Sequence, residues 1–229
     1  MPPVNFVGDM GGGGLMLAFG VVCALLHAGR KGEGQVIDSA IVDGSAALTV
    51  MLYGLLAQGR WSHIPGANFV DTGSPYYDVY ETSDRKYVAV GAIEPAFYAV
   101  LLEKLGLPAE DVHTQNDRSR WPEVKRAFAD IFAGRSRDEW AAIFEGTDAC
   151  VSPVLTLEEA AAHPHNQARQ VFTEVDGIVQ PSPAPRFTRT PPELTRLPPA
   201  PGADTANVLR SFGKTDDDIE ALRREGIVA

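Results

Sequence analysis

Two long apolar stretches near the start of the chain limit most strongly what it can fold into. Residues 11–28 contain four consecutive glycines followed by an almost uninterrupted apolar run, and residues 39–57 are nearly as apolar. The pattern predicts helices over 15–28 and 39–57 that are apolar on every side, and such helices are normally buried. Exposed apolar surface of that size favours association. We therefore expect a second subunit, or a segment that precedes this chain, to cover both helices.

The first apolar stretch also raises a transmembrane alternative, because a membrane span needs roughly 20 predominantly apolar residues. The glycines at one end and His27 at the other favour a buried helix of a soluble protein instead. The first residues lack the charged region that is typical of a secretory signal. We expect a cytoplasmic protein that does not contact a membrane.

Composition and charge argue against several other classes of function. Hydrophobic residues make up 45% of the 229 residues, and the formal net charge is −10. Such an acidic chain is not expected to bind nucleic acid, which requires a basic surface. Cys23 and Cys150 belong to no cluster with metal-ligand spacing, which predicts buried free thiols and no metal site. His163-Pro164-His165 offers too few ligands, and its proline favours a loop.

The remaining pattern predicts an α/β fold in two parts. Residues 1–60 are expected to form part of a large, Rossmann-like α/β domain, with a short strand at 35–38 between the two apolar helices. Residues 61–75 are rich in glycine and proline and are interpreted as a linker or a functional loop. A small α+β domain follows over 76–165. Residues 166–229 are expected to form an extended, proline-rich return that ends in a C-terminal helix.

The small domain has the clearest local signals. Two alternating segments around a polar turn predict a β-hairpin, and proline and capping residues mark the helix starts that follow. The expected elements are strands at 76–80, 87–90 and 151–155, helices at 96–105, 121–133 and 138–145, and a short helix that begins at Thr156.

Asp9 is a candidate catalytic carboxylate, because it stands directly before the glycine run that leads into the first helix. Gly11 and Gly12 permit close approach of the backbone to a ligand. A helix N-terminus offers unpaired N–H groups and a positive dipole end, which can stabilise a carboxylate or a developing enolate. An aspartate before a helix can also simply cap it, so two interpretations stay open at this point.

Glu94 is a second candidate, since it precedes Pro95 at the expected start of the helix over 96–105. One interpretation is a first-turn charge that the helix dipole favours. The other is a functional carboxylate at the mouth of the small domain.

Three motifs, taken together and in this order, carry a resemblance to a known family. They are Gly8-Asp9-Met10 followed by four glycines, Gly34-Gln35-Val36-Ile37-Asp38, and the run Gly91-Ala92-Ile93-Glu94-Pro95-Ala96-Phe97-Tyr98. With them, the chain resembles the α-methylacyl-CoA racemases of the family III CoA-transferase superfamily. The end of the chain, from Val208 to Leu222, is similar to that family as well. The resemblance covers essentially the whole chain and implies the family III CoA-transferase fold.

The resemblance implies a reaction. Racemases of this type exchange the proton next to the thioester carbonyl of a 2-methylacyl-CoA through an enolate, with an acid–base group on each face. Asp9 matches the aspartate that acts on one face, and Glu94 matches the glutamate that pairs with a histidine base on the other. Coenzyme A is part of the substrate, so no separate cofactor is expected. The resemblance also implies an interlocked homodimer.

Several other residues are candidates for substrate contact within this resemblance. Gly11 and Gly12 belong to the motif around Asp9. Tyr77 either lines the acyl pocket or packs on its strand. Ile41, Val70 and Ile93 line the acyl channel or belong to the core.

The sequence departs from the family in one respect. The histidine of these racemases lies before the glycine-rich motif, and only eight residues precede Asp9 here. We expect this chain to be the C-terminal portion of a racemase and not to racemise alone. Two alternatives remain: a CoA-transferase in which Asp9 is the nucleophile, and a non-catalytic fragment or subunit. The four glycines and Glu94 favour the racemase over the transferase.

Overall fold

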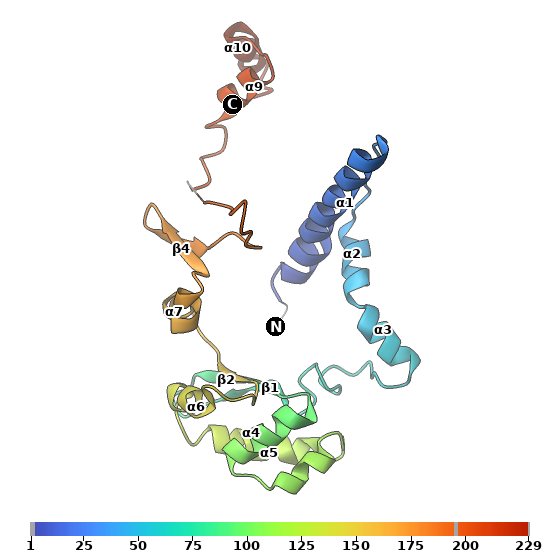
Figure 1. Cartoon of the computed structure of the whole chain (residues 1–229), viewed down its shortest axis with the longest axis vertical. Helices are drawn as coiled ribbons and strands as arrows, with labels where there is room; N and C mark the ends of the chain where they lie inside the picture. Colours follow the sequence, from blue (N-terminus) through green and yellow to red (C-terminus); the bar gives the residue numbers. More distant parts are fainter. Residues whose placement is uncertain (1–2, 195–196, 229) are drawn as a thin grey trace. The chain divides into compact units, whose positions relative to one another are not determined.

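A computed structural model describes residues 3–194 and 197–228 of the chain. Its fold is mixed α/β, as the sequence predicts, and it divides into two compact units between Val154 and Leu155 (Figure 1). The assignment of residues 1–60, 61–75, 76–165 and 166–229 to separate structural parts stays a prediction.

The chain opens with one continuous helical stretch. A π-helix, η1 (Phe6–Leu15), passes directly into α1 (Met16–Lys31), drawn in blue in Figure 1. The N–H of Met10 donates to the carbonyl of Asn5 over 3.1 Å, which is the i to i+5 spacing of a π-helix. α1 ends at Gly32, whose φ of 73° is in the left-handed region that glycine tolerates best.

The second apolar segment forms two helices, α2 (Ile41–Leu48) and α3 (Val50–Ala57), rather than the single helix predicted over 39–57. The break is at Thr49, whose hydroxyl donates to the carbonyl of Ala46 over 2.7 Å. Such a side-chain bond to the preceding turn competes with helix continuation. The predicted strand over 35–38 is also wrong: these residues pair with no strand in the described part of the chain, and a strand without a neighbour has no ladder of hydrogen bonds.

The prediction that both apolar segments are buried is wrong for the isolated chain. No residue of α1 is buried, and the side chain of Phe19 is 67% exposed. Cys23 and Cys150, expected to be buried thiols, are both exposed. By length and hydropathy the stretch Phe6–Lys31 could cross a membrane, a property it shares with the core helices of soluble proteins. The exposure leaves open the expectation that another surface covers these helices.

The sheet of the first unit has three antiparallel strands in the order β1 (Tyr77–Glu81), β2 (Tyr87–Gly91) and β3 (Val151–Pro153). The predicted hairpin is confirmed, with Tyr77 opposite Gly91. The helices of this part are α4 (Pro95–Leu105), the short 3₁₀ helix η2 (Ala109–Thr114), α5 (Trp121–Phe132) and α6 (Arg137–Phe144).

An aromatic core holds these helices to the sheet. Tyr80 of β1 stacks on Phe132 of α5 with ring centroids 5.1 Å apart, and Phe132 meets Trp140 of α6 edge-on at 5.2 Å. All three side chains are at most 4% exposed. Such aromatic pairs stabilise a fold beyond the burial of their area. The core therefore packs α5 and α6 against the sheet.

The second unit contains a two-stranded antiparallel sheet and four helices among its described residues. They are α7 (Leu157–Ala162), α8 (Pro164–Ala168), β4 (Phe172–Val175), β5 (Ile178–Pro181), α9 (Thr205–Ser211) and α10 (Asp216–Arg224). The loop expected at His163-Pro164-His165 is wrong, because Pro164 takes the first position of α8. The proline-rich segment after β5 has no helix or strand among its described residues, and residues 195–196 lie outside them.

Candidate functional site

Asp9 lies inside η1 and not at its cap. The N-cap position belongs to Asn5, and Asp9 is an acidic residue of the first turn. Its side chain is exposed and makes no hydrogen bond or ion pair with another described residue. The capping interpretation of Asp9 is therefore wrong. The carboxylate stands unengaged near the positive end of a helix, where a negative charge is favoured.

The glycine run after Asp9 provides a close helix crossing. Gly12 and Gly44 face each other where η1 packs against α2, and both are buried. A Cβ on Gly44 would overlap the carbonyl oxygen of Gly12 and lie 2.9 Å from its Cα. A Cβ on Gly12 would lie 2.7 Å from the backbone nitrogen of Ser45. Only glycine permits this backbone contact, so Gly12 has a packing role, and its predicted contact with substrate stays a prediction.

Ile41 belongs to the same crossing. Its side chain lies beside Gly8 and Gly13, because a Cβ on these glycines would be 3.8 and 3.0 Å from it. Gly11 is partly exposed on the same helix. The structure thus groups Asp9, Gly11, Gly12 and Ile41 around η1, while the roles of Gly11 and Ile41 in substrate binding remain predictions.

Glu94 begins α4 and leaves its carboxylate unused. It occupies the N-cap position with extended backbone angles, followed by Pro95, but its side chain makes no capping hydrogen bond. The side chain is exposed and has no hydrogen-bond partner among the described residues. The backbone carbonyl of Glu94, by contrast, accepts from the N–H of Tyr98 over 2.9 Å. The backbone therefore anchors Glu94 while its acid group is available.

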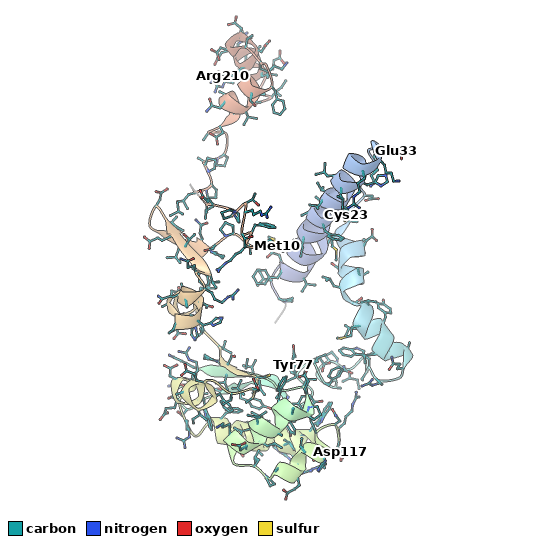
Figure 2. All side chains as sticks on the ribbon, in the orientation of Figure 1. Met10, Cys23, Glu33, Tyr77, Asp117 and Arg210 are labelled. Atoms are coloured by element: carbon teal, nitrogen blue, oxygen red, sulfur yellow. The ribbon has the colours of Figure 1, made fainter. Side chains whose placement is uncertain are left out.

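Tyr77 and Cys150 lie beside Gly91 at the end of β2 that leads to Ile93 and Glu94. Tyr77 is opposite Gly91, whose carbonyl accepts from the N–H of Ile93 over 3.0 Å and whose N–H donates to the carbonyl of Cys150 over 2.9 Å. Burial, and next the nearby carboxylate of Glu94, raise the pKa of the Cys150 thiol. Tyr77, labelled in Figure 2, is 40% exposed, and Ile93 is half-buried. A carboxyl group, a phenol and an apolar side chain thus lie at this end of the sheet.

Val70 belongs to a loop that a buried asparagine organises, a feature that the sequence interpretation missed. The side chain of Asn68, only 1% exposed, donates to Asp71 over 2.7 Å and accepts from the N–H of Ser62 over 2.7 Å. Asp71 also accepts from the backbone N–H groups of Asn68 and Gly66. Residues 61–75 are thus an ordered loop, and Val70 is half-buried within it.

The charge of Asp71 makes this loop sensitive to acid. Burial acts to raise its pKa, but the hydrogen bonds from Asn68 and from the backbone of Gly66 outweigh burial and hold the pKa below its ordinary value. A lowered pKa in the folded protein means that ionised Asp71 stabilises the fold above about pH 4, and that this contribution is lost as pH falls through the lowered pKa.

We expect Asp71→Asn to lower the melting temperature at neutral pH, and the difference from the unsubstituted protein to shrink at pH values below about 4. Circular dichroism melts between pH 7 and pH 3 measure this difference. Asp130→Asn, on the exposed surface of α5, is a matched control for loss of one charge. A difference for Asp71→Asn that stays constant down to pH 3 would contradict the role assigned to its ionised form.

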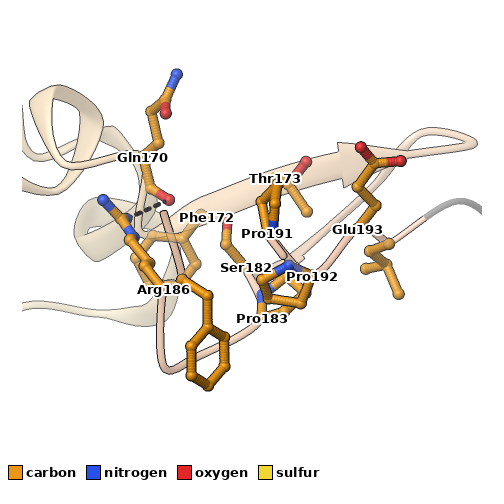
Figure 3. A pocket seen from close by; sticks show the side chains of 11 residues that line it. Gln170, Phe172, Thr173, Ser182, Pro183, Arg186, Pro191, Pro192 and Glu193 are labelled. Atoms are coloured by element: carbon orange, nitrogen blue, oxygen red, sulfur yellow. Dashed lines mark hydrogen bonds between the residues drawn. The ribbon is translucent and has the colours of Figure 1, made fainter. Parts of the chain in front are cut away.

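A cavity of about 690 Å³ lies in the second unit beside β4, and its lining contains none of the predicted site residues (Figure 3). Arg186, the one cation among the described residues of its lining, already donates to the backbone carbonyls of Arg169 and Gln170. Among the described residues, no group of three or more His, Cys, Asp or Glu side chains could hold a metal ion.

Comparison with known proteins identifies the family. The sequence profile of CoA-transferase family III matches residues 2–205, a stretch that includes both Asp9 and Glu94. The chain belongs to CoA-transferase family III. This match includes residues of both compact units and confirms the resemblance to the family III CoA-transferase superfamily.

Among family III proteins, two relatives are similar along almost the whole chain. The alpha-methylacyl-CoA racemases of Mus musculus and Homo sapiens are 46% and 42% identical to it, each over 99% of this chain and 60% of the racemase. A CaiB/BaiF family protein from Brucella suis has the same fold, with a TM-score of 0.65 at 19% identity, over 93% of this chain and 56% of that chain. The chain thus spans about 60% of the length of the two racemases.

Proposed function

We propose that this chain is part of an acyl-CoA racemase, and that Asp9 and Glu94 carry its acid–base chemistry. The observation that carries the proposal is the state of these two carboxylates. Each is exposed, is fixed by its backbone near the N-terminus of a helix, and has no partner among the described residues. An acid–base group must be within reach of the proton that it transfers, and the exposed carboxylates of Asp9 and Glu94 meet this requirement. The two racemases that are 46% and 42% identical support the same assignment.

The proposed reaction exchanges the proton on the carbon next to the thioester carbonyl. A base on one face removes this proton, the C–H electron pair moves into the thioester, and an enolate forms. An acid on the other face then delivers a proton to the same carbon, which inverts it. Asp9 acts on one face. On the other face Glu94 pairs with a histidine base, as the racemase family implies, and holds its charge and orientation.

The exposed apolar helices support a partner for the whole protein. The side chains of Phe19, Val22 and Leu25 on α1 are between 63% and 67% exposed. Exposed apolar surface of this kind marks interaction sites. The interlocked homodimer expected from the family would cover it.

Deuterium exchange into 2-methylacyl-CoA, followed by mass spectrometry in heavy water, tests the proposal. We expect no exchange by the chain alone. We expect exchange when the chain is co-expressed with the part of the mouse racemase that lies outside the matched 60%. Exchange by the chain alone would overturn the expectation that it is inactive by itself. Absence of exchange in the reconstituted sample would overturn the racemase assignment.

A CoA-transferase remains the second candidate, because a free carboxylate near a helix N-terminus could also attack a thioester. Asp9 would then form a mixed anhydride and release coenzyme A as the thiol. Hydroxylamine traps such an anhydride as a hydroxamate. A hydroxamate on the peptide that contains Asp9, formed only with acyl-CoA present, would favour transfer over racemisation.

A non-catalytic role makes a different prediction. Binding of a ligand to the folded state raises the melting temperature, by an amount that grows with ligand concentration. If acyl-CoA leaves the melting temperature unchanged in both the chain and the reconstituted sample, the protein is a non-catalytic subunit or fragment.

A further inference from the structure

A cavity of about 490 Å³ lies in the first unit, next to Ile93 and close in sequence to Glu94. Its walls include Tyr76 and Trp121, which are buried, and Phe69 and Ile93, which are half-buried. The rest of its lining is exposed and consists of Gly59, Arg60, Asn116 and Arg118. A cavity of this size, with an apolar part formed by the aromatic side chains and Ile93 and a larger polar part, can accommodate a small molecule that carries a polar group.

The two guanidinium groups of this cavity are not neutralised. Neither Arg60 nor Arg118 forms an ion pair with a carboxylate of the described residues, although the chain has a net charge of −10. Arg118 donates one hydrogen bond to the backbone carbonyl of Arg60 over 2.9 Å and lies 5.5 Å above the ring of Trp121. This leaves most of its five donors available to an anion.

The cavity is preformed. The hydroxyl of Tyr76 donates to Asn116 over 2.9 Å, and the indole N–H of Trp121 donates to the carbonyl of Gln115 over 2.9 Å. Phe69 follows Asn68 in the ordered loop, and its carbonyl accepts from the hydroxyl of Ser74 over 2.8 Å. Because these bonds fix the walls before a ligand arrives, little ordering is needed on binding.

We propose that this cavity binds the anionic far end of an acyl chain, a carboxylate carried on an apolar body. The apolar walls would contact the body of the chain, and Arg118, with Arg60, would pair with the carboxylate. Ile93 joins this cavity to the edge that carries Glu94, so one acyl chain could reach both. The choice of an acyl group rests on the proposed function, whereas binding of the anion does not.

Isothermal titration of the 229-residue chain with decanedioate tests the cavity. We expect decanedioate to bind, and decanediol, which is neutral, to bind at least about tenfold more weakly, because a charge-assisted hydrogen bond is roughly twice as strong as a neutral one. Arg118→Gln should weaken decanedioate by about tenfold or more. The control Arg126→Gln removes the same charge from an exposed position on α5 outside the cavity.

Three results would overturn the proposal. They are no binding of decanedioate, equal affinity for the diol, and equal loss of affinity in the Arg118 and Arg126 variants. Adenosine bisphosphate is the probe for the other source of an anion, the nucleotide of coenzyme A. If it binds more tightly than decanedioate and depends on Arg118, the acyl assignment is wrong. The exchange assay can fail while Arg118-dependent binding persists, which separates this proposal from the racemase assignment.

Discussion

Asp9→Asn is expected to lower the rate of α-proton exchange by about 10²–10⁴-fold in the reconstituted protein, the usual range for a general acid–base group. The substitution keeps the size of the side chain but removes its ability to accept and return a proton. Because Asp9 makes no hydrogen bond or ion pair with another described residue, its replacement should leave the fold intact. The initial rate of deuterium uptake by 2-methylacyl-CoA measures the effect.

Asp43→Asn is the matched control. Asp43 is exposed in the first turn of α2, the helix that η1 contacts, so this variant removes the same charge from the same region. We expect its exchange rate to equal that of the unsubstituted protein. A comparable loss in both variants would show that charge near the glycine run matters and that Asp9 has no special role. Glu94→Gln should reduce exchange as well, since the charge that supports the opposite base is removed.

Gly44→Ala is expected to disrupt the crossing of η1 and α2. The added methyl would overlap the carbonyl oxygen of Gly12, so the two helices would have to move apart and lose part of their packing. Overpacking of this kind costs about 1–3 kcal/mol. The amides of η1 and α2 should therefore exchange with heavy water about tenfold faster or more, as hydrogen exchange with mass spectrometry would show.

Gly54→Ala is the control that distinguishes the effect of overpacking from the effect of alanine on helix propensity. Gly54 lies in α3, and a Cβ there would meet nothing within 4 Å. Alanine in a helix is favoured over glycine by up to about 1 kcal/mol, so this variant should protect the amides of α3 or leave them unchanged. If Gly44→Ala behaves in the same way, the backbone contact between Gly12 and Gly44 is not needed for the fold.

The sequence predicts the sheet region well, because its signals are local. Alternation marks the hairpin, Pro95 marks the start of α4, and Ser136 and Thr156 form the capping boxes that begin α6 and α7. Each of these signals acts within four residues and needs no distant partner. They also place Ile93 and Glu94 correctly between a strand and a helix.

The glycine run and the loop before the hairpin are harder to predict. Four glycines have no side-chain periodicity, and glycine is more common in turns than in helices. The sequence therefore does not predict the π-helix, which the contact with α2 stabilises. Val36 and Ile37 favour a strand, but no neighbouring strand pairs with them. The bonds between Asn68 and Asp71, three residues apart, are a signal that could have been found. The cavity lined by Arg60 and Arg118 could not be predicted either. It depends on a tertiary contact between these two residues, which are far apart in the sequence.

The two cysteines make the covering of the apolar helices observable. Cys23 is exposed on α1, while Cys150 is exposed at the start of β3. Alkylation with iodoacetamide can be quantified at both thiols in one sample. If another surface covers α1, modification of Cys23 should be slower than in the isolated chain. The reactivity of Cys23 would thus report whether α1 is covered, without an added label.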